Sequence, residues 1–244
     1  MRPDGKSLRL RERERMFLEL RVHGHESAQD KWVETAQLTE ATELGAGFIM
    51  PRLVEPGRLL QLVLAMPRRL RLFDKADPQY RVWALVRRLG LLAPDAAGAT
   101  HFSYGVAFIG KQPPPSYETT PTTLYDLLPT LARNGMWVAR EQPRMTGPFI
   151  IPSEPRQTMN VQVVIEVFDE KGQVVEREQT ETENISQGGA SIRATFSVKP
   201  GRFLRLTSEQ PPLSILAVVR GQHTGEDQIA CLHLEFIGGR WPLE

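Results

Sequence analysis

The sequence predicts an all-β protein made of two tandem antiparallel β-barrels, which are joined by a Pro/Thr-rich linker with a short helix. Three observations indicate this fold class. Short segments of alternating apolar and polar residues are separated by Gly and Pro turns along most of the chain. No convincing amphipathic helix lies among these segments. A polar turn at 183–192 has a counterpart at 39–48, which indicates an internal duplication and therefore two similar domains.

The duplication has a constant offset of 144 positions. At this offset an acidic or amide residue, a hydroxyl residue and a glycine coincide: Glu40 with Asn184, Thr42 with Ser186, and Gly45 with Gly189. The Pro-Gly-Arg turn at 56–58 coincides in the same way with the one at 200–202. Agreement at this many chemically special positions is difficult to produce by chance, so the repeated turn is the feature from which function should follow.

The composition limits the classes of function. The 244 residues, 41% hydrophobic and 24% charged, are enough for two ordinary globular domains, each with a modest core. The formal net charge of +1 gives no bulk electrostatic attraction to nucleic acid or to anionic lipid. We therefore expect no nucleic-acid partner, and any anion that the protein binds should be small.

Cys231 is the single cysteine, which excludes an intramolecular disulfide and fits a reducing compartment. Its apolar surroundings predict a buried strand position rather than a nucleophile. The N-terminal residues lack the apolar stretch of a secretory leader, and no uninterrupted apolar run reaches membrane-spanning length. These features predict a cytoplasmic protein without membrane insertion.

The first half begins with a charged run at 9–15, which is either a solvated arm or an arginine clamp for an anion. Alternation of apolar and polar residues then predicts six strands, with reversals at the repeated turn and at the Pro-Gly pair. The predicted strands are 16–22, 31–38, 45–50, 59–65, 81–87 and 104–109.

The segment from 111 to 154 has a different composition, which is rich in Pro and Thr. We predict a linker with one ordered element, a short helix at 124–133 that is capped by Thr and ends at Asn-Gly. Trp137 and Phe149 are the expected anchors of this helix.

The second half repeats the strand order of the first. A hairpin turn is predicted at 169–172, where Asp-Glu-Lys-Gly separates two strands. The predicted strands are 161–168, 174–182, 191–198, 202–206, 214–220 and 229–237. The last strand of each half ends in the same Phe-Ile-Gly sequence, which supports the duplication.

These motifs resemble those of PilZ domains, the bacterial receptor modules for cyclic di-GMP. The mark of that family is an Arg-x-x-x-Arg pair just before the first strand, followed after the second strand by an Asp/Asn-x-Ser-x-x-Gly turn. The resemblance implies a PilZ-like barrel at 8–110, a linker at 111–154 and a second PilZ-like barrel at 155–240.

In the first barrel, the resemblance assigns ligand binding to Arg11 and Arg15 of the arginine pair and to Glu40, Thr42 and Gly45 of the turn. Glu replaces the family's Asp here and Thr replaces Ser. These replacements keep the carboxylate and the hydroxyl, but they move the carboxylate outward by one methylene.

In the second barrel, the resemblance assigns the same role to Asn184, Ser186 and Gly189, which form an intact turn. The arginine pair is reduced to Arg156 with Asn160, so one cation is missing. The loss of a desolvated, bidentate arginine contact costs roughly 2–5 kcal/mol. On charge grounds the first barrel is therefore the favoured site, unless another basic residue such as Arg193 replaces the missing cation.

The resemblance implies a non-enzymatic bacterial signalling receptor or adaptor that binds cyclic di-GMP through an arginine arm and a polar turn, and that acts on a protein effector which the sequence does not identify. The alternative is a degenerate PilZ module that binds a protein partner and no nucleotide. The completeness of the arginine-plus-turn site distinguishes the two hypotheses, and here the site is divided between the two copies.

Enzymatic and metal-binding functions have little support in the sequence. The chain has no Gly-x-Ser-x-Gly elbow, no phosphate-binding loop and no dinucleotide-binding glycine motif. The five histidines are scattered and lack the His-x-x-x-His spacing of a helical zinc site. We therefore predict no catalytic residues, no metal and no cofactor other than the nucleotide ligand.

Overall fold

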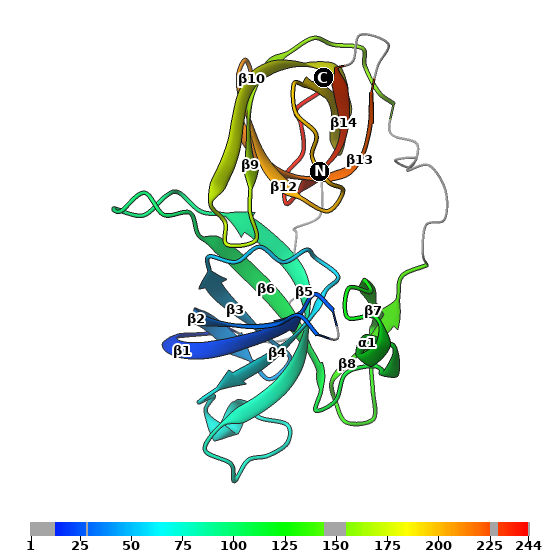
Figure 1. The fold of residues 1–244 in the computed structure, drawn as a ribbon. Helices are drawn as coiled ribbons and strands as arrows, with labels where there is room; N and C mark the ends of the chain where they lie inside the picture. The colour runs from blue at the N-terminus through cyan, green and yellow to red at the C-terminus, as the bar shows by residue number, and fades with distance from the viewer. Residues whose placement is uncertain (1–12, 28, 144–154, 225–228, 244) are drawn as a thin grey trace, which may run out of the picture. The chain divides into compact units, whose positions relative to one another are not determined.

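The computed structural model describes residues 13–27, 29–143, 155–224 and 229–243. The chain divides into two compact units. Unit 1 takes Met1–Met50, Pro56–Arg87 and Tyr104–Gln142, and unit 2 takes Pro51–Glu55, Arg88–Ser103 and Pro143–Glu244. The strands of the two halves form two closed antiparallel barrels, each with six strands (Figure 1). The predicted fold class is thereby confirmed.

Barrel 1 closes in the strand order β1-β2-β3-β6-β5-β4. Its strands are β1 (Glu14–His25), β2 (Lys31–Thr42), β3 (Gly45–Met50), β4 (Leu59–Leu64), β5 (Tyr80–Leu91) and β6 (Phe102–Gly110). Alternation along β1 shows why this segment is a strand: Leu20 and Val22 are buried, whereas Glu19 and Arg21 are exposed. Every strand that the sequence predicts in this half is present.

Barrel 2 closes in the order β9-β10-β11-β14-β13-β12. In Figure 1 its strands are seen as a ring. Its strands are β9 (Gln162–Phe168), β10 (Val174–Ile185), β11 (Gly189–Ala194), β12 (Phe203–Glu209), β13 (Pro212–Thr224) and β14 (Ala230–Ile237). Inward-facing aliphatic residues such as Ile165, Leu232 and Leu234 form its core. The predicted hairpin at 169–172 is confirmed, since the Asp169 carboxylate accepts hydrogen bonds from the amides of Lys171 and Gln173.

The two barrels share their strand order, and the hydrogen bonds of the repeated turn recur in both. The Thr42 hydroxyl donates to the carbonyl of Gly45 at 3.4 Å, and the Ser186 hydroxyl donates to the carbonyl of Gly189 at 3.3 Å. A side-chain hydroxyl that bonds to the backbone of its own turn favours a tight reversal. The hydroxyl residue of the motif therefore shapes the turn in each copy.

The last strand of each barrel holds the repeated turn through the shared Phe-Ile-Gly sequence. The amide of Phe108 donates to the carbonyl of Leu44 at 2.9 Å, and the amide of Phe236 donates to the carbonyl of Gly188 at 2.8 Å. The two hydrogen bonds occupy equivalent places in the two barrels, so the duplication extends from the sequence to the hydrogen bonds of the backbone.

The duplicated Pro-Gly-Arg turns also adopt the same conformation. Gly57 has φ of +95° and Gly201 has φ of +89°, values that L-residues with a side chain rarely adopt. The amide of Gly57 donates to Val86 at 2.8 Å, and the amide of Gly201 donates to Val219 at 2.7 Å. Glycine is thus required at both positions for the entry into the fourth strand of each barrel.

The predicted helix at 124–133 is wrong, because this segment contains the strand β7 (Tyr125–Leu131), paired with β8 (Trp137–Glu141). Pro129 explains the difference: within a helix it would remove a hydrogen bond and clash with the preceding turn. In β7 it falls at a register shift between Leu127 and Leu131, where no ladder bond is lost.

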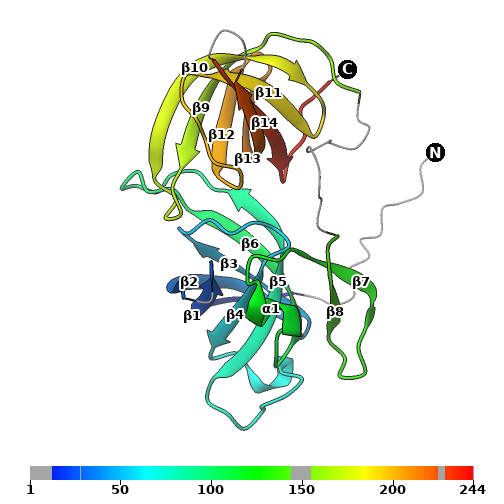
Figure 2. The same cartoon turned by 45° about the vertical axis from the view of Figure 1, so that its right-hand side comes forward.

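The short helix of this region is instead α1 (Pro115–Thr119), which begins at a proline. Proline is well tolerated in the first helical turn, where its missing N–H has no intrahelical partner anyway. Figure 2 shows α1 beside barrel 1, and the residues of the contact explain this position. Tyr117 of α1 and Tyr125 of β7 pack against Leu59 and Trp83 of the barrel.

These two tyrosines, rather than the predicted Trp137, anchor the segment. Tyr117 is 2% exposed and Tyr125 is fully buried, whereas Trp137 is only half-buried. Phe149 lies outside the described residues. The region after barrel 1 is therefore in large part an ordered addition to unit 1.

Helical structure is sparse in the part of the chain that the structure describes. Besides α1 there is a single turn of 3-10 helix, η1 (Arg68–Leu70). Neither helix has the length and apolar character needed to cross a membrane.

Candidate functional site

The intact turn of barrel 2 connects β10 to β11 and carries three of the predicted ligand residues. Asn184 lies near the end of β10, Ser186 lies in the turn and Gly189 begins β11. Ser186 is fully buried, and both its amide and its hydroxyl donate to the carbonyl of Gly189. Ser186 therefore builds the turn.

Arg156 is brought to this turn by a short backbone bridge. The amide of Gln157 donates to the carbonyl of Ile185 at 2.8 Å, and the amide of Ile185 donates back at 3.0 Å. The guanidinium Nη1 of Arg156 then donates to Asn184 Oδ1 at 3.2 Å and to Ser191 Oγ at 3.3 Å. The predicted arginine and the predicted amide thus lie together, joined by a serine that the sequence analysis did not assign.

Ser191 reaches this position because alternate residues of β11 face away from the core. Ala190 and Ile192 belong to the core of barrel 2, and Ser191 between them faces outward. On β14, directly across the ladder, Ser191 pairs with His233. Ser191 Oγ lies 3.1 Å from His233 Nδ1, so the polar contacts continue from the arginine onto β14.

A cluster of metal-ligating side chains follows on the same outer face. Cys231 lies two residues before His233 on β14, and His223 of β13 pairs directly with Cys231. The ligand atoms of His223, Cys231 and His233 all lie within 4.8 Å of one another. We call these three residues the His/Cys cluster. Helical His spacing does not reveal this cluster, because its Cys-x-His pair shares one face of a strand.

The protonation of the cluster is set by its neighbours. Burial lowers the pKa of His233, with His223 and Arg156 adding to the effect and Glu183 opposing it. Burial and the Glu183 carboxylate raise the pKa of the Cys231 thiol to about 12. The thiol donates to Glu183 Oε2 at 3.1 Å. His233 is thus neutral near pH 7, and Cys231 is a protonated thiol.

Barrel 1 presents its motif residues differently. Arg15 lies opposite Glu40 in the β1–β2 ladder, and Glu40 forms an ion pair with Arg13. Thr42 accepts a hydrogen bond from the amide of Leu44 at 3.1 Å, besides its bond to Gly45. Arg11 lies outside the described residues. The carboxylate of this turn is therefore already engaged by an arginine from its own barrel.

Gly45 has a clear structural requirement. A Cβ atom at this position would lie 2.3 Å from the backbone carbonyl oxygen of Val106. Real Cβ atoms do not approach backbone so closely, so any other residue would push β3 away from β6. The glycine of the motif permits the close packing of the turn on the last strand.

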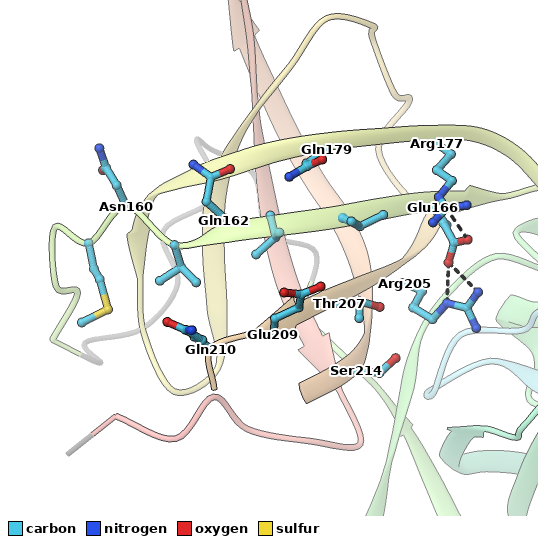
Figure 3. A pocket seen from close by; sticks show the side chains of 14 residues that line it. Asn160, Gln162, Glu166, Arg177, Gln179, Arg205, Thr207, Glu209, Gln210 and Ser214 are labelled. Atoms are coloured by element: carbon cyan, nitrogen blue, oxygen red, sulfur yellow. Dashed lines mark hydrogen bonds and ion pairs between the residues drawn. The ribbon is translucent and has the colours of Figure 1, made fainter. Parts of the chain in front are cut away.

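A groove of about 950 Å³ on barrel 2 lies apart from these residues, along β9, β10 and β12 (Figure 3). Its basic side chains are already paired: Arg205 bonds to Glu166 at 2.5 Å and Arg177 approaches the same carboxylate at 3.8 Å. None of the predicted ligand residues lines it. The groove therefore offers an anion little unpaired positive charge.

Residues 140–240 match a protein-family model described as "PilZ domain". These residues contain the whole of barrel 2, so this part of the chain is a PilZ domain, and barrel 1 repeats its strand order in tandem. No curated protein matches the chain at a significant level.

Three solved structures align with most of the chain. The inhibitor of motility MotI/DgrA of Bacillus subtilis has 13% identity and a TM-score of 0.30, covering 93% of this chain and 90% of that one. MrkH of K. pneumonia in complex with c-di-GMP has 11% identity and a TM-score of 0.28, covering 90% and 79%. YcgR of Escherichia coli in complex with c-di-GMP has 8% identity and a TM-score of 0.28, covering 91% and 76%.

Proposed function

We propose that this protein is a non-enzymatic signalling receptor that binds cyclic di-GMP on the outer face of barrel 2. The observation that carries the proposal is the contact of Arg156 with Asn184 and Ser191, which joins the arginine arm to the intact polar turn. The match of residues 140–240 to the PilZ domain supports the same barrel. Binding would change how the arm is held, and a protein effector would read that change.

The chemistry of this face suits a guanine nucleotide. The arginine fork donates to phosphate oxygens or to the O6/N7 edge of guanine, and it also stacks on bases. The Asn184 amide and the Ser191 hydroxyl add short donors and acceptors. Arg156 is exposed and Ser191 is 1% exposed, so the arginine can move towards a ligand while the serine stays fixed in the sheet.

This proposal reverses the preference for barrel 1 that charge counting indicates. The carboxylate of Glu40 would repel phosphate, and it forms an ion pair with Arg13, which is not one of the two motif arginines. In barrel 2 the turn carries a neutral amide, so Arg156 keeps its full positive charge for the ligand. The missing second cation at Asn160 predicts a weaker site than a complete arginine pair would give.

Isothermal titration with cyclic di-GMP tests the proposal on four proteins: the intact chain, Arg156→Ala, Arg15→Ala and the control Arg177→Ala. Arg177 is an exposed arginine of the same barrel that is remote from the turn in the ladder, so its removal controls for charge. We expect binding in the intact chain, its loss in Arg156→Ala and little change in the other two.

The other outcomes separate the remaining functions. Loss in Arg15→Ala alone would assign the nucleotide to barrel 1. Absence of heat for the intact chain at tens of micromolar would refute the receptor and favour the degenerate module that binds a protein partner without nucleotide.

A further inference from the structure

We propose that His223, Cys231 and His233 form a binding site for a divalent transition metal of the zinc class on the outer face of barrel 2. The ligand set is one thiol and two imidazoles, the donors that zinc takes in proteins. This inference is independent of the proposed nucleotide binding, because it rests on the His/Cys cluster alone.

The sheet places the three ligands on one face. Cys231 and His233 are alternate residues of β14, and His223 lies opposite Cys231 in the neighbouring strand β13. Leu232, between the two β14 ligands, points into the core. The positions of all three ligands are thereby set by the barrel, so that little ordering is needed when a metal binds.

The distances are close to those of a tetrahedral site. The ring atoms His223 Nδ1 and His233 Nε2 are 3.0 Å apart, and the three ligand atoms lie within 4.8 Å of one another. Tetrahedral zinc with Zn–N of about 2.0–2.1 Å and Zn–S of about 2.3 Å needs ligand atoms roughly 3.3–3.6 Å apart. Side-chain rotations must therefore widen the contact between the two rings and bring any more distant ligand atom to this spacing.

The surroundings allow a metal to enter. His223 is exposed, His233 is half-buried and Cys231 is 4% exposed. A metal ion can therefore reach the buried sulfur from the solvent by way of the exposed imidazole. Opposite His233 the β13 residue is Gly221, which has no side chain to cover the ring; an added Cβ atom would lie 3.9 Å from His233 Cδ2. Glu183, whose Oε2 lies 3.1 Å from Cys231 Sγ, places a negative charge next to the incoming cation. The fourth coordination position is left for water.

Metal binding would couple the cluster to the arginine site through one hydrogen bond. Coordination releases the thiol proton to solvent, and both facing ring nitrogens must then be free of protons. His233 keeps its proton on Nδ1, where it donates to Ser191 Oγ, now 3.1 Å away. Ser191 also accepts from Arg156, so it acts as a positioning residue shared by the two sites.

Titration of the full chain with Co²⁺, followed by back-titration with Zn²⁺, tests the site. Because Cys231 is the single cysteine, a thiolate-to-cobalt charge-transfer band reports this site alone. We expect the band to saturate at one cobalt per chain, to disappear on addition of zinc and to be absent in Cys231→Ser. His223→Gln should weaken cobalt binding at least 10-fold, and Ser191→Ala by roughly 10-fold, the lower end of the effect of losing an outer-shell partner.

His101→Gln is the matched control, because it removes a histidine that the cluster does not contain. Absence of the charge-transfer band at excess cobalt would overturn the proposal, as would equal weakening by His223→Gln and His101→Gln. If Cys231→Ser does not fold, the exposed His223 still decides the outcome, because its replacement leaves the core intact.

Discussion

The Nη1 atom of Arg156 lies 3.2 Å from the Oδ1 atom of Asn184, although 28 residues separate the two in the sequence. This contact joins the segment before β9 to the end of β10. The backbone bridge between Gln157 and Ile185 holds the two segments together. The proposed nucleotide site of barrel 2 therefore rests on backbone hydrogen bonds of the barrel itself.

The first prediction concerns the geometry of the guanidinium. Arg156→Lys keeps the charge but loses the planar guanidinium, whose Nη1 atom contacts both Asn184 and Ser191. We expect cyclic di-GMP to bind about 10-fold more weakly, equivalent to about 1.4 kcal/mol, in an isothermal titration. The melting temperature should not change, because Arg156 is exposed. Arg177→Lys serves as the control, and equal affinities of the intact chain and Arg156→Lys would contradict a specific role of the guanidinium.

The second prediction concerns the glycine of the barrel 1 turn. Gly45→Ala forces a Cβ atom against the Val106 carbonyl, which lies 2.3 Å from its ideal position. We expect a loss of about 1–3 kcal/mol in the free energy of unfolding, measured by denaturant titration. Gly221→Ala is the control, because its Cβ would meet the nearest atom at 3.9 Å. Similar stabilities of the two variants would show that the turn can relax.

The third prediction tests whether α1 is part of unit 1. Tyr117 is 2% exposed and its ring lies 4.8 Å from that of Trp83 in an edge-on contact. Tyr117→Ala should destabilise the protein by about 3–5 kcal/mol, as truncation of buried aromatic residues generally does. Phe17→Ala removes an aromatic side chain that is 75% exposed and should have almost no effect. Equal thermal melting of both variants would mean that the segment after β6 does not stabilise the barrel.

The fourth prediction is a loss of stability in mild acid. The pKa of His23 is lowered by burial first and then by Arg21 and Arg81, and the pKa of His25 is lowered by burial first as well. A lowered pKa in the folded state means that the unfolded chain binds protons more readily. The stability that comes from neutral His23 and His25 is therefore present above pH 6.5, their ordinary pKa, and is lost as the pH falls below it.

Thermal melting at about pH 7.5 and about pH 5.5 measures this effect. We expect a lower melting temperature in acid, and a smaller difference between the two pH values in His23→Gln than in the intact chain. If the difference in melting temperature between the two pH values is the same in His23→Gln as in the intact chain, His23 does not contribute to the loss of stability in acid. A higher melting temperature in acid would contradict the direction of the pKa shift itself.

The strand pattern could be predicted well from local chemistry. Alternation of apolar and polar residues indicates a strand that buries one face, and the Gly and Pro turns divide the strands at the correct places. The secondary structure of region 111–142 was harder to predict, because proline has two different structural roles there. Pro115 begins a helix and Pro129 interrupts a strand ladder, and only the burial of Tyr117 and Tyr125 against barrel 1 distinguishes them.

By itself, the sequence determined the all-β class, the duplication and the motif positions, because these depend on periodicity and on turn residues that act locally. Only the tertiary structure decided which side chains meet. Ser191, His223, Cys231 and His233 lie on three strands, and their assembly depends on the register of β11, β14 and β13. Register comes from the closure of the whole barrel around its core, so no local pattern in the sequence shows that these residues share one outer face.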